Sequence, residues 1–150
     1  MGRAAAECFA ADSARVAVMA RSRDDLDATV AALKTLGAPD AVGLQVDLFD
    51  GASVDAALAE LAQRWGHLNA LVNAAGPLMG DLKSFETYTD EEWQSVYSGL
   101  LMGAVRTIRA ALPLMRKAEW ARIVNVSAMS TKRQSPSLVA YTSAKAALTS

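Results

Sequence analysis

The sequence predicts an α/β protein in which helices pack on a buried parallel sheet. Apolar residues recur at helical spacing in some segments and form short continuous runs in others, and the two kinds of segment alternate along the chain. The chain has 150 residues, of which 52% are hydrophobic and 21% are charged. This is enough apolar material for one compact domain, and it argues against a disordered chain.

Helical and strand patterns take turns through the first half of the chain. Acidic residues follow Ser22, where they favour the positive end of a helix dipole. Glycine follows the helical patterns because it readily adopts the left-handed conformation found at helix ends. The expected elements are, in order, a helix with Ala5, Cys8 and Phe9 on one face, a strand over 14–20, a helix from Ser22 or Asp24 to Gly37 with a stripe of Leu26, Val30 and Leu33, a strand over 42–46, and a helix with Val54, Ala57, Leu58 and Leu61 that stops at Gly66.

The second half continues the alternation with longer helices. The expected elements are a strand over 68–73 that ends in a glycine loop, a loop with a short helical piece over 77–89, a long helix or a pair of helices over 90–117, a strand over 122–126, a loop over 128–137, and a helix from Leu138 onward.

Charge and cysteine content exclude several classes of function. The formal net charge is −1 at pH 7, so the chain offers no basic surface for nucleic acid or for an anionic membrane. The single cysteine, Cys8, excludes a disulfide framework and a multi-cysteine metal site, and no metal is expected. The N-terminus lacks a secretory pattern, and no apolar run approaches the roughly 20 residues that cross a bilayer. We therefore expect a cytoplasmic location.

Tyr141 and Lys145 are the residues best suited to chemistry. They lie four apart at the start of the last expected helix, so both side chains leave the same face, roughly 6 Å apart. A phenol that exchanges a proton near neutrality needs its phenolate stabilised by about 4 kcal/mol, and a nearby ammonium supplies part of that. The same spacing also occurs where a tyrosine is half-buried and the lysine is solvated, so the pair needs support from its context.

Motifs that follow three of the expected strands provide that context, because open parallel sheets bind ligands at the carboxyl ends of their strands. The motifs are Tyr141-Thr-Ser-Ala-Lys145, Asn73-Ala74-Ala75-Gly76 and Asp47-Leu48. With these motifs, the chain resembles the short-chain dehydrogenase/reductase (SDR) family over its whole length. The resemblance implies a Rossmann-like doubly wound parallel sheet and an oxidoreductase that moves hydride between NADP(H) and a carbonyl or alcohol substrate.

The resemblance also implies catalytic roles. Tyr141 would exchange a proton with the substrate oxygen, and Lys145 would be its electrostatic partner and a ligand of the nicotinamide ribose. The family's substrate-orienting serine falls, without gaps, on Ala128. Ser127 is the expected replacement after a one-residue change in loop length, although neighbours on a strand point to opposite faces. Leu100 stands where the family usually carries an asparagine of a proton relay, so that relay must be rebuilt or lost.

Cofactor choice is predicted from the end of the strand over 14–20. Ala20 and Arg21 stand there in place of the carboxylate that binds the ribose 2′-hydroxyl of NAD. A guanidinium suits a 2′-phosphate, so NADP is expected and NAD is less favoured, unless Arg21 is only a solvated charge at a helix start. Asp47 is expected to contact adenine with Leu48, and it is also suited to cap the next helix. The implied cofactor ligands are Gly2, Arg21, Asp47, Leu48, Asn73, Ala74, Gly76, Tyr141 and Lys145.

The resemblance further predicts elements that the sequence does not contain. The family begins with a strand and a three-glycine loop, of which Gly2 would be the last glycine, and it continues with further strands. Residues 1–150 are therefore expected to be a partial NAD(P)-binding Rossmann-like domain that lacks the first strand and the C-terminal strands. The loss would leave a gap of about 9.6 Å between the strands over 14–20 and 68–73 unless these close up. We expect a fragment of a longer reductase with little or no NADP turnover by itself.

Two other functions stay open at this stage. A non-catalytic dinucleotide-binding or regulatory module is favoured by Ala128, Leu100 and the missing glycine loop. A sugar epimerase or dehydratase of the extended branch would use the same tyrosine and lysine, but the motifs are more similar to those of the simple reductases.

Substrate and assembly are less accessible from the sequence. The substrate is expected to be a small molecule, with residues 77–80 and 128–137 forming one wall of its pocket. For the full-length form, the resemblance implies a homo-oligomer assembled through helices near 98–117 and 138–150.

Overall fold

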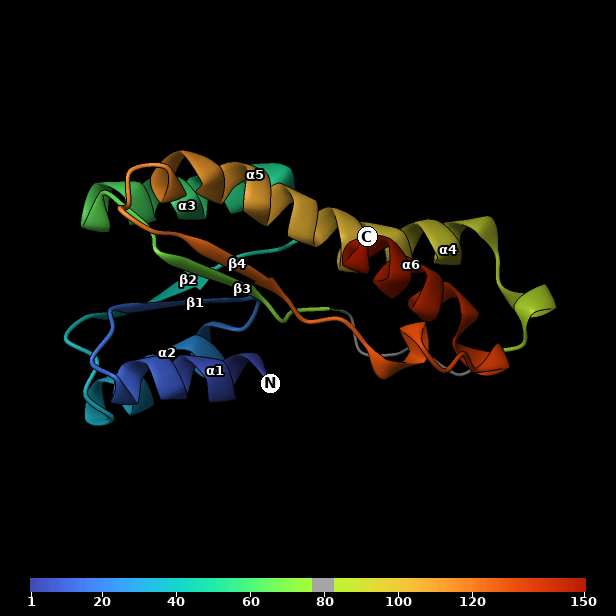
Figure 1. Ribbon diagram of the computed structural model, residues 1–150, viewed down its shortest axis with the longest axis horizontal. Coiled ribbons are helices and arrows are strands. Elements are labelled where there is room, and N and C mark those ends of the chain that lie inside the picture. The colour runs from blue at the N-terminus through green and yellow to red at the C-terminus, as the bar shows by residue number, and fades with distance from the viewer. Residues whose placement is uncertain (77–82) are drawn as a thin grey trace. The chain divides into compact units, whose positions relative to one another are not determined.

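The computed structural model describes residues 1–76 and 83–150, which divide into two compact units at residues 67 and 68. Each unit contains a two-stranded parallel sheet with helices against it (Figure 1). The expected α/β class is therefore confirmed. Residues 77–80, predicted to line the substrate pocket, lie outside the described part of the chain.

The first unit follows the predicted order of elements. It contains helix α1 (Gly2–Ala11), strand β1 (Val16–Ala20), helix α2 (Arg23–Thr35), strand β2 (Ala41–Gln45) and helix α3 (Gly51–Trp65). The two strands pair in register from Val16 opposite Ala41 to Ala20 opposite Gln45. In Figure 1, α1 and α2 lie together on one side of this pair.

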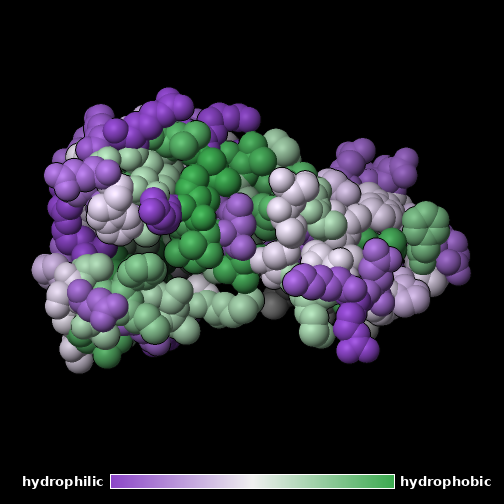
Figure 2. All heavy atoms as spheres, in the orientation of Figure 1, coloured by the Kyte–Doolittle hydropathy of each residue, from purple (hydrophilic) through white to green (hydrophobic). Residues whose placement is uncertain are grey.

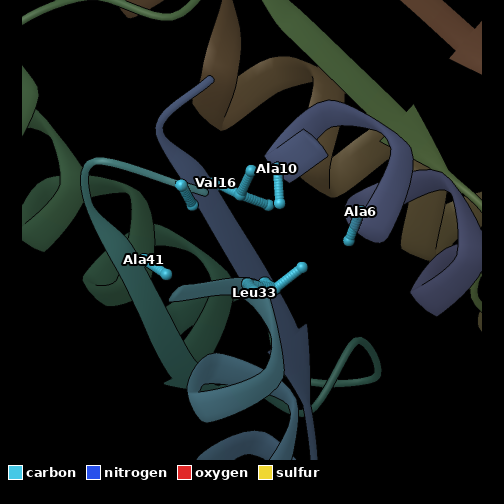
Figure 3. Close-up of a cluster of buried hydrophobic side chains, with 6 residues drawn as sticks. Ala6, Ala10, Val16, Leu33 and Ala41 are labelled. Carbon is cyan, nitrogen blue, oxygen red and sulfur yellow. The ribbon is translucent and has the colours of Figure 1, made fainter. Parts of the chain in front are cut away.

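The core of this unit beneath α1 and α2 is built mostly from small side chains (Figure 3). Its buried members are Ala6, Ala10, Val16, Leu33, Ala38 and Ala41. The predicted inward face of α1 was wrong, because Cys8 and Phe9 are exposed while Ala6 and Ala10 are buried. Alanine allows the helix backbone to approach the strand closely, whereas the larger side chains would hold it away.

The apolar stripes predicted for the other two helices are confirmed. In α2, Leu26 and Leu33 are buried and Val30 is half-buried, and in α3 all four predicted positions are buried. Helix α3 ends at Gly66, which has a φ of 74°. This left-handed conformation is costly for residues with a Cβ, so the glycine explains the helix end.

The second unit places a parallel strand pair beside a long helical run. It contains β3 (Ala70–Asn73), a short 3-10 turn η1 (Phe85–Thr87), α4 (Asp90–Tyr97), a π-helical turn η2 (Ser98–Met102), α5 (Gly103–Met115), β4 (Arg122–Asn125), the 3-10 turns η3 (Met129–Thr131) and η4 (Pro136–Leu138), and α6 (Val139–Thr149). The strands pair from Ala70 opposite Arg122 to Asn73 opposite Asn125. The long helical segment predicted over 90–117 is thus interrupted by a change of hydrogen-bonding pattern.

Strand β4 differs from the predicted buried strand. Ile123 is 37% exposed and Val124 is 52% exposed, and Figure 2 shows a strongly hydrophobic band where β4 lies in Figure 1. Among the described strands, β4 pairs only with β3. Its apolar residues lack the cover that a fully buried parallel strand receives on both faces.

Candidate active site and nucleotide-binding residues

Helix α6 brings Tyr141 and Lys145 together as the spacing predicts. The Lys145 Nζ lies 6.0 Å from the centre of the Tyr141 ring. Lys145 is only 5% exposed, whereas Tyr141 is half-buried. The two side chains therefore leave the same face of α6, with the Lys145 ammonium beside the Tyr141 ring.

The Lys145 ammonium is held by a single hydrogen bond among the described residues. Its Nζ donates a hydrogen bond to the Val126 carbonyl oxygen over 2.7 Å, just beyond the end of β4. Burial lowers the pKa of Lys145, because desolvation disfavours the charged form. An ammonium has three N–H donors, and in the described part of the chain this bond is the only one found for Nζ. The remaining donors suit a hydroxyl-bearing partner such as a ribose.

Ser127 points toward the far end of α6. Its Oγ lies 2.6 Å from the Thr149 Oγ1 and 3.5 Å from the Lys145 carbonyl oxygen. Thr149 is eight residues beyond Tyr141, or about 12 Å along a helix axis. The predicted substrate-orienting role of Ser127 therefore requires its hydroxyl to leave Thr149. The neighbouring Ser130 has a buried Oγ with no hydrogen-bond partner among the described residues.

A line of polar side chains holds the carboxyl ends of β3 and β4 together. The Thr107 Oγ1 donates to the Asn73 Oδ1 over 2.7 Å, and the Asn73 Nδ2 donates to the Asn125 Oδ1 over 2.9 Å. Thr107 is buried in α5. Of these three residues, only Asn73 was predicted from the sequence. Asn125 could have been found from its position at a strand end, but no local pattern marks Thr107.

The Leu100 side chain packs close to the backbone at Gly76. A Cβ built on Gly76 would lie 2.5 Å from the Leu100 Cδ2, so a side chain there would displace the leucine. Leu100 is 3% exposed and lies in the π-helical turn η2. An apolar, buried side chain thus fills the position predicted for a relay asparagine. Ala74 lies between Asn73 and Gly76, just after β3.

In the first unit, the predicted nucleotide ligands lie around the ends of β1 and β2. Arg21 follows β1 and is exposed, and no described residue forms a hydrogen bond or an ion pair with its guanidinium. Ser22 caps α2 by accepting a hydrogen bond from the Asp25 N–H over 3.2 Å. Gly2 is the first residue of α1. Arg21 is therefore positioned before the helix and is available to an anion.

The Asp47-Leu48 turn follows β2. The Asp47 carboxylate accepts from the Phe49 N–H over 3.0 Å, and the Asp47 N–H donates to the Ser53 Oγ over 3.1 Å. Asp50 caps α3 by accepting from the Ala52 N–H over 2.9 Å. The interpretation of Asp47 as the helix cap was wrong, because the helix begins three residues later than that role needs.

Two findings concern other kinds of site. Within residues 1–76 and 83–150, no group of three or more His, Cys, Asp or Glu side chains is arranged to hold a metal ion. No helix in the described part of the chain is long and apolar enough to span a membrane.

The comparisons with known proteins show the family to which the chain belongs. A sequence profile described as short chain dehydrogenase matches residues 1–150, and the chain belongs to this family. It is 32% identical over 150 residues to an uncharacterised oxidoreductase, YvrD, of Bacillus subtilis. The matched region covers 100% of this chain and 55% of YvrD. It is also 30% identical to a sorbitol dehydrogenase of Cereibacter sphaeroides, over 100% of this chain and 57% of that protein. The chain thus spans about half the length of the curated relatives it matches.

A solved structure gives the same assignment. L-Sorbose reductase from Gluconobacter frateurii, complexed with NADPH and L-sorbose, matches with a TM-score of 0.89 and 29% identity, over 98% of this chain and 56% of the reductase. The Rossmann-like α/β fold is therefore established, and the chain covers only part of it. The family is one of NAD(P)-dependent oxidoreductases, and the relatives found are dehydrogenases and reductases. They give no support to a non-catalytic module.

Proposed function

We propose that this chain carries the acid–base residues of an NADP(H)-dependent oxidoreductase that interconverts a small carbonyl compound and its alcohol. The observation that carries the proposal is the Tyr141–Lys145 pair on α6, with a buried ammonium 6.0 Å from the phenol ring. Tyr141 gives its proton to the substrate oxygen during reduction and takes it back during oxidation. The dinucleotide supplies or accepts the hydride when it is bound.

Lys145 serves this chemistry in two ways. Its ammonium stabilises the phenolate form of Tyr141, and its open N–H donors bind the ribose hydroxyls of the nicotinamide half. The bond to the Val126 carbonyl oxygen fixes where the ammonium lies. We further propose that Asn73, Ala74 and Gly76 line the cofactor after β3, and that Gly2, Asp47 and Leu48 contact its adenosine and phosphate portions.

NADP is favoured over NAD by the turn after β1. Arg21 presents a guanidinium that no described residue engages, and Ala20 supplies no carboxylate for a ribose 2′-hydroxyl. A 2′-phosphate would give Arg21 a charge-assisted, bidentate partner.

The test is the variant Tyr141→Phe in the whole protein that contains these residues. Loss of the hydroxyl should lower kcat for NADPH-dependent ketone reduction by about a hundredfold or more, while the Kd of NADPH stays near its original value. Tyr88→Phe is the matched control, because Tyr88 packs against Trp93 with ring centres 5.9 Å apart and has no place in the proposed chemistry. Reduction that survives Tyr141→Phe would refute the acid–base assignment.

Substrate orientation is proposed to come from the segment after β4, with Ser127 as the leading residue. Ser127→Ala should then lower kcat more than Ser130→Ala does. The reverse order would transfer the role to Ser130, whose buried hydroxyl has no partner among the described residues.

A further inference from the structure

The backbone after β1 leaves the sheet at Arg21. The last backbone hydrogen bond between the two strands runs from the Val46 N–H to the Ala20 carbonyl oxygen over 2.9 Å, and the paired register ends at Ala20 opposite Gln45. The Arg21 carbonyl is thus the first acceptor beyond the ladder. A backbone carbonyl in this position needs a partner from outside the regular sheet pattern.

A side chain of the neighbouring strand supplies that partner. The Gln45 Nε2 donates to the Arg21 carbonyl oxygen over 2.9 Å. Gln45 is the last residue of β2 and is exposed, so its side chain has no role in the core. Its amide extends the hydrogen bonding between the two strands by one residue, into the turn that carries Arg21.

The two arginines of this turn are used differently. Arg23 donates from its guanidinium to the Gly43 carbonyl oxygen over 3.2 Å and lies 4.0 Å from the Asp27 carboxylate. Arg21 is held through its backbone, and no described residue binds its guanidinium. The local bonds therefore commit Arg23 to the protein and leave Arg21 for a ligand.

We propose that Gln45 is a positioning residue for recognition of the cofactor 2′-phosphate, acting through the backbone of Arg21. This inference rests on the proposed use of NADP. A guanidinium that forms two parallel bonds to phosphate depends on where its backbone is held, and a turn fixed in advance loses less conformational freedom on binding. Gln45 does not touch the phosphate. It determines where Arg21 can present its side chain.

The measurement is the ratio of two dissociation constants, those of 5′-AMP and 2′,5′-ADP, on the whole protein that contains these residues. These nucleotides differ only in the 2′-phosphate, so the ratio isolates its recognition from adenosine binding. Wild-type chain should prefer 2′,5′-ADP. Gln45→Met keeps the size of the side chain without its donor, and should reduce the preference about three- to tenfold, the worth of one net hydrogen bond. Affinity for 5′-AMP should stay close to wild type.

Two further variants serve as a rescue and as a control. Gln45→His places an Nε2 donor at the same number of bonds from Cβ, and at about pH 8, where histidine is mostly neutral, it should restore the preference. Gln63→Met is the matched control, because Gln63 is an exposed residue of α3 in the same unit. It should leave the ratio unchanged. Gln45→Ala replaces Gln45→Met if the methionine variant does not fold.

Each contrary outcome has a definite meaning. An unchanged ratio in Gln45→Met would overturn the positioning role and leave the proposed use of NADP standing. Equal losses of affinity for both nucleotides would show that Gln45 is only structural and would also overturn it. A wild-type chain that does not prefer 2′,5′-ADP would refute the proposed use of NADP, and this inference with it.

Discussion

Replacing Gly43 by alanine should destabilise the first unit, because α2 lies too close to β2 for a side chain at this position. An ideal Cβ on Gly43 would lie 2.9 Å from the Leu26 Cβ and 3.3 Å from the Val30 Cγ2. Carbon atoms in good contact are about 3.5–4.0 Å apart. The Leu26 Cβ is attached directly to the helix backbone, so no rotamer change removes it. The helix itself must shift.

The expected cost follows from this overlap. Forcing extra volume into a packed core costs about 1–3 kcal/mol. Replacing glycine in a strand returns about 0.5–1 kcal/mol by restricting the unfolded chain. Leu26 is only 2% exposed, so a shift of α2 opens contacts that are now closed. We expect the free energy of unfolding to fall by about 1–2 kcal/mol.

Urea unfolding followed by circular dichroism measures this change. Gly43→Ala should lower the urea midpoint without changing the slope, and Gly43→Val should lower it further. Gly66 gives the matched control, because it has a φ of +74° and nothing within 4 Å of a built Cβ. There, Gly66→Ala should cost stability through the backbone alone, and Gly66→Asn should cost less, since asparagine tolerates this conformation better. A Gly43→Ala midpoint at or above that of wild type would refute the steric argument.

Two further changes test the side-chain networks. Thr107→Val removes the buried hydroxyl that donates to the Asn73 Oδ1 and should lower the free energy of unfolding by about 1–3 kcal/mol, whereas Thr107→Ser should retain most of it; equal urea midpoints for the two variants would contradict this. The donors of Arg64 and Trp65 hold the pKa of the Asp40 carboxyl well below its usual range, so its contribution to stability is present above about pH 4, the ordinary pKa, and is lost as the pH falls toward the lowered one. Asp40→Asn should therefore lower the urea midpoint more at pH 7 than at pH 3, and by more than Glu7→Gln does in the exposed pair on α1; a pH-independent effect would be evidence against the ion-pair explanation.

The family assignment came from short motifs whose spacing is meaningful before any tertiary contact exists. Tyr141 and Lys145 share a face of α6 because a helix repeats every 3.6 residues, whatever packs against it. The stripes of α2 and α3 were predicted for the same reason. The inward face of α1 was not, because alanine, cysteine and phenylalanine all count as apolar and only packing decides which of them fits against a strand.

The sequence by itself thus determined the order of helices and strands and the parallel class of the sheet, which follow from the alternation of helical and continuous apolar patterns. It also determined the tyrosine–lysine pair, which follows from the helical repeat. Tertiary structure decided which polar side chains find partners. Ser127 turned to Thr149, 22 residues away, and Gln45 reached the Arg21 backbone across 24 residues. Such pairings depend on which strands and helices become neighbours, and a hydrogen bond needs its two atoms within about 3 Å. No spacing along the chain encodes that distance.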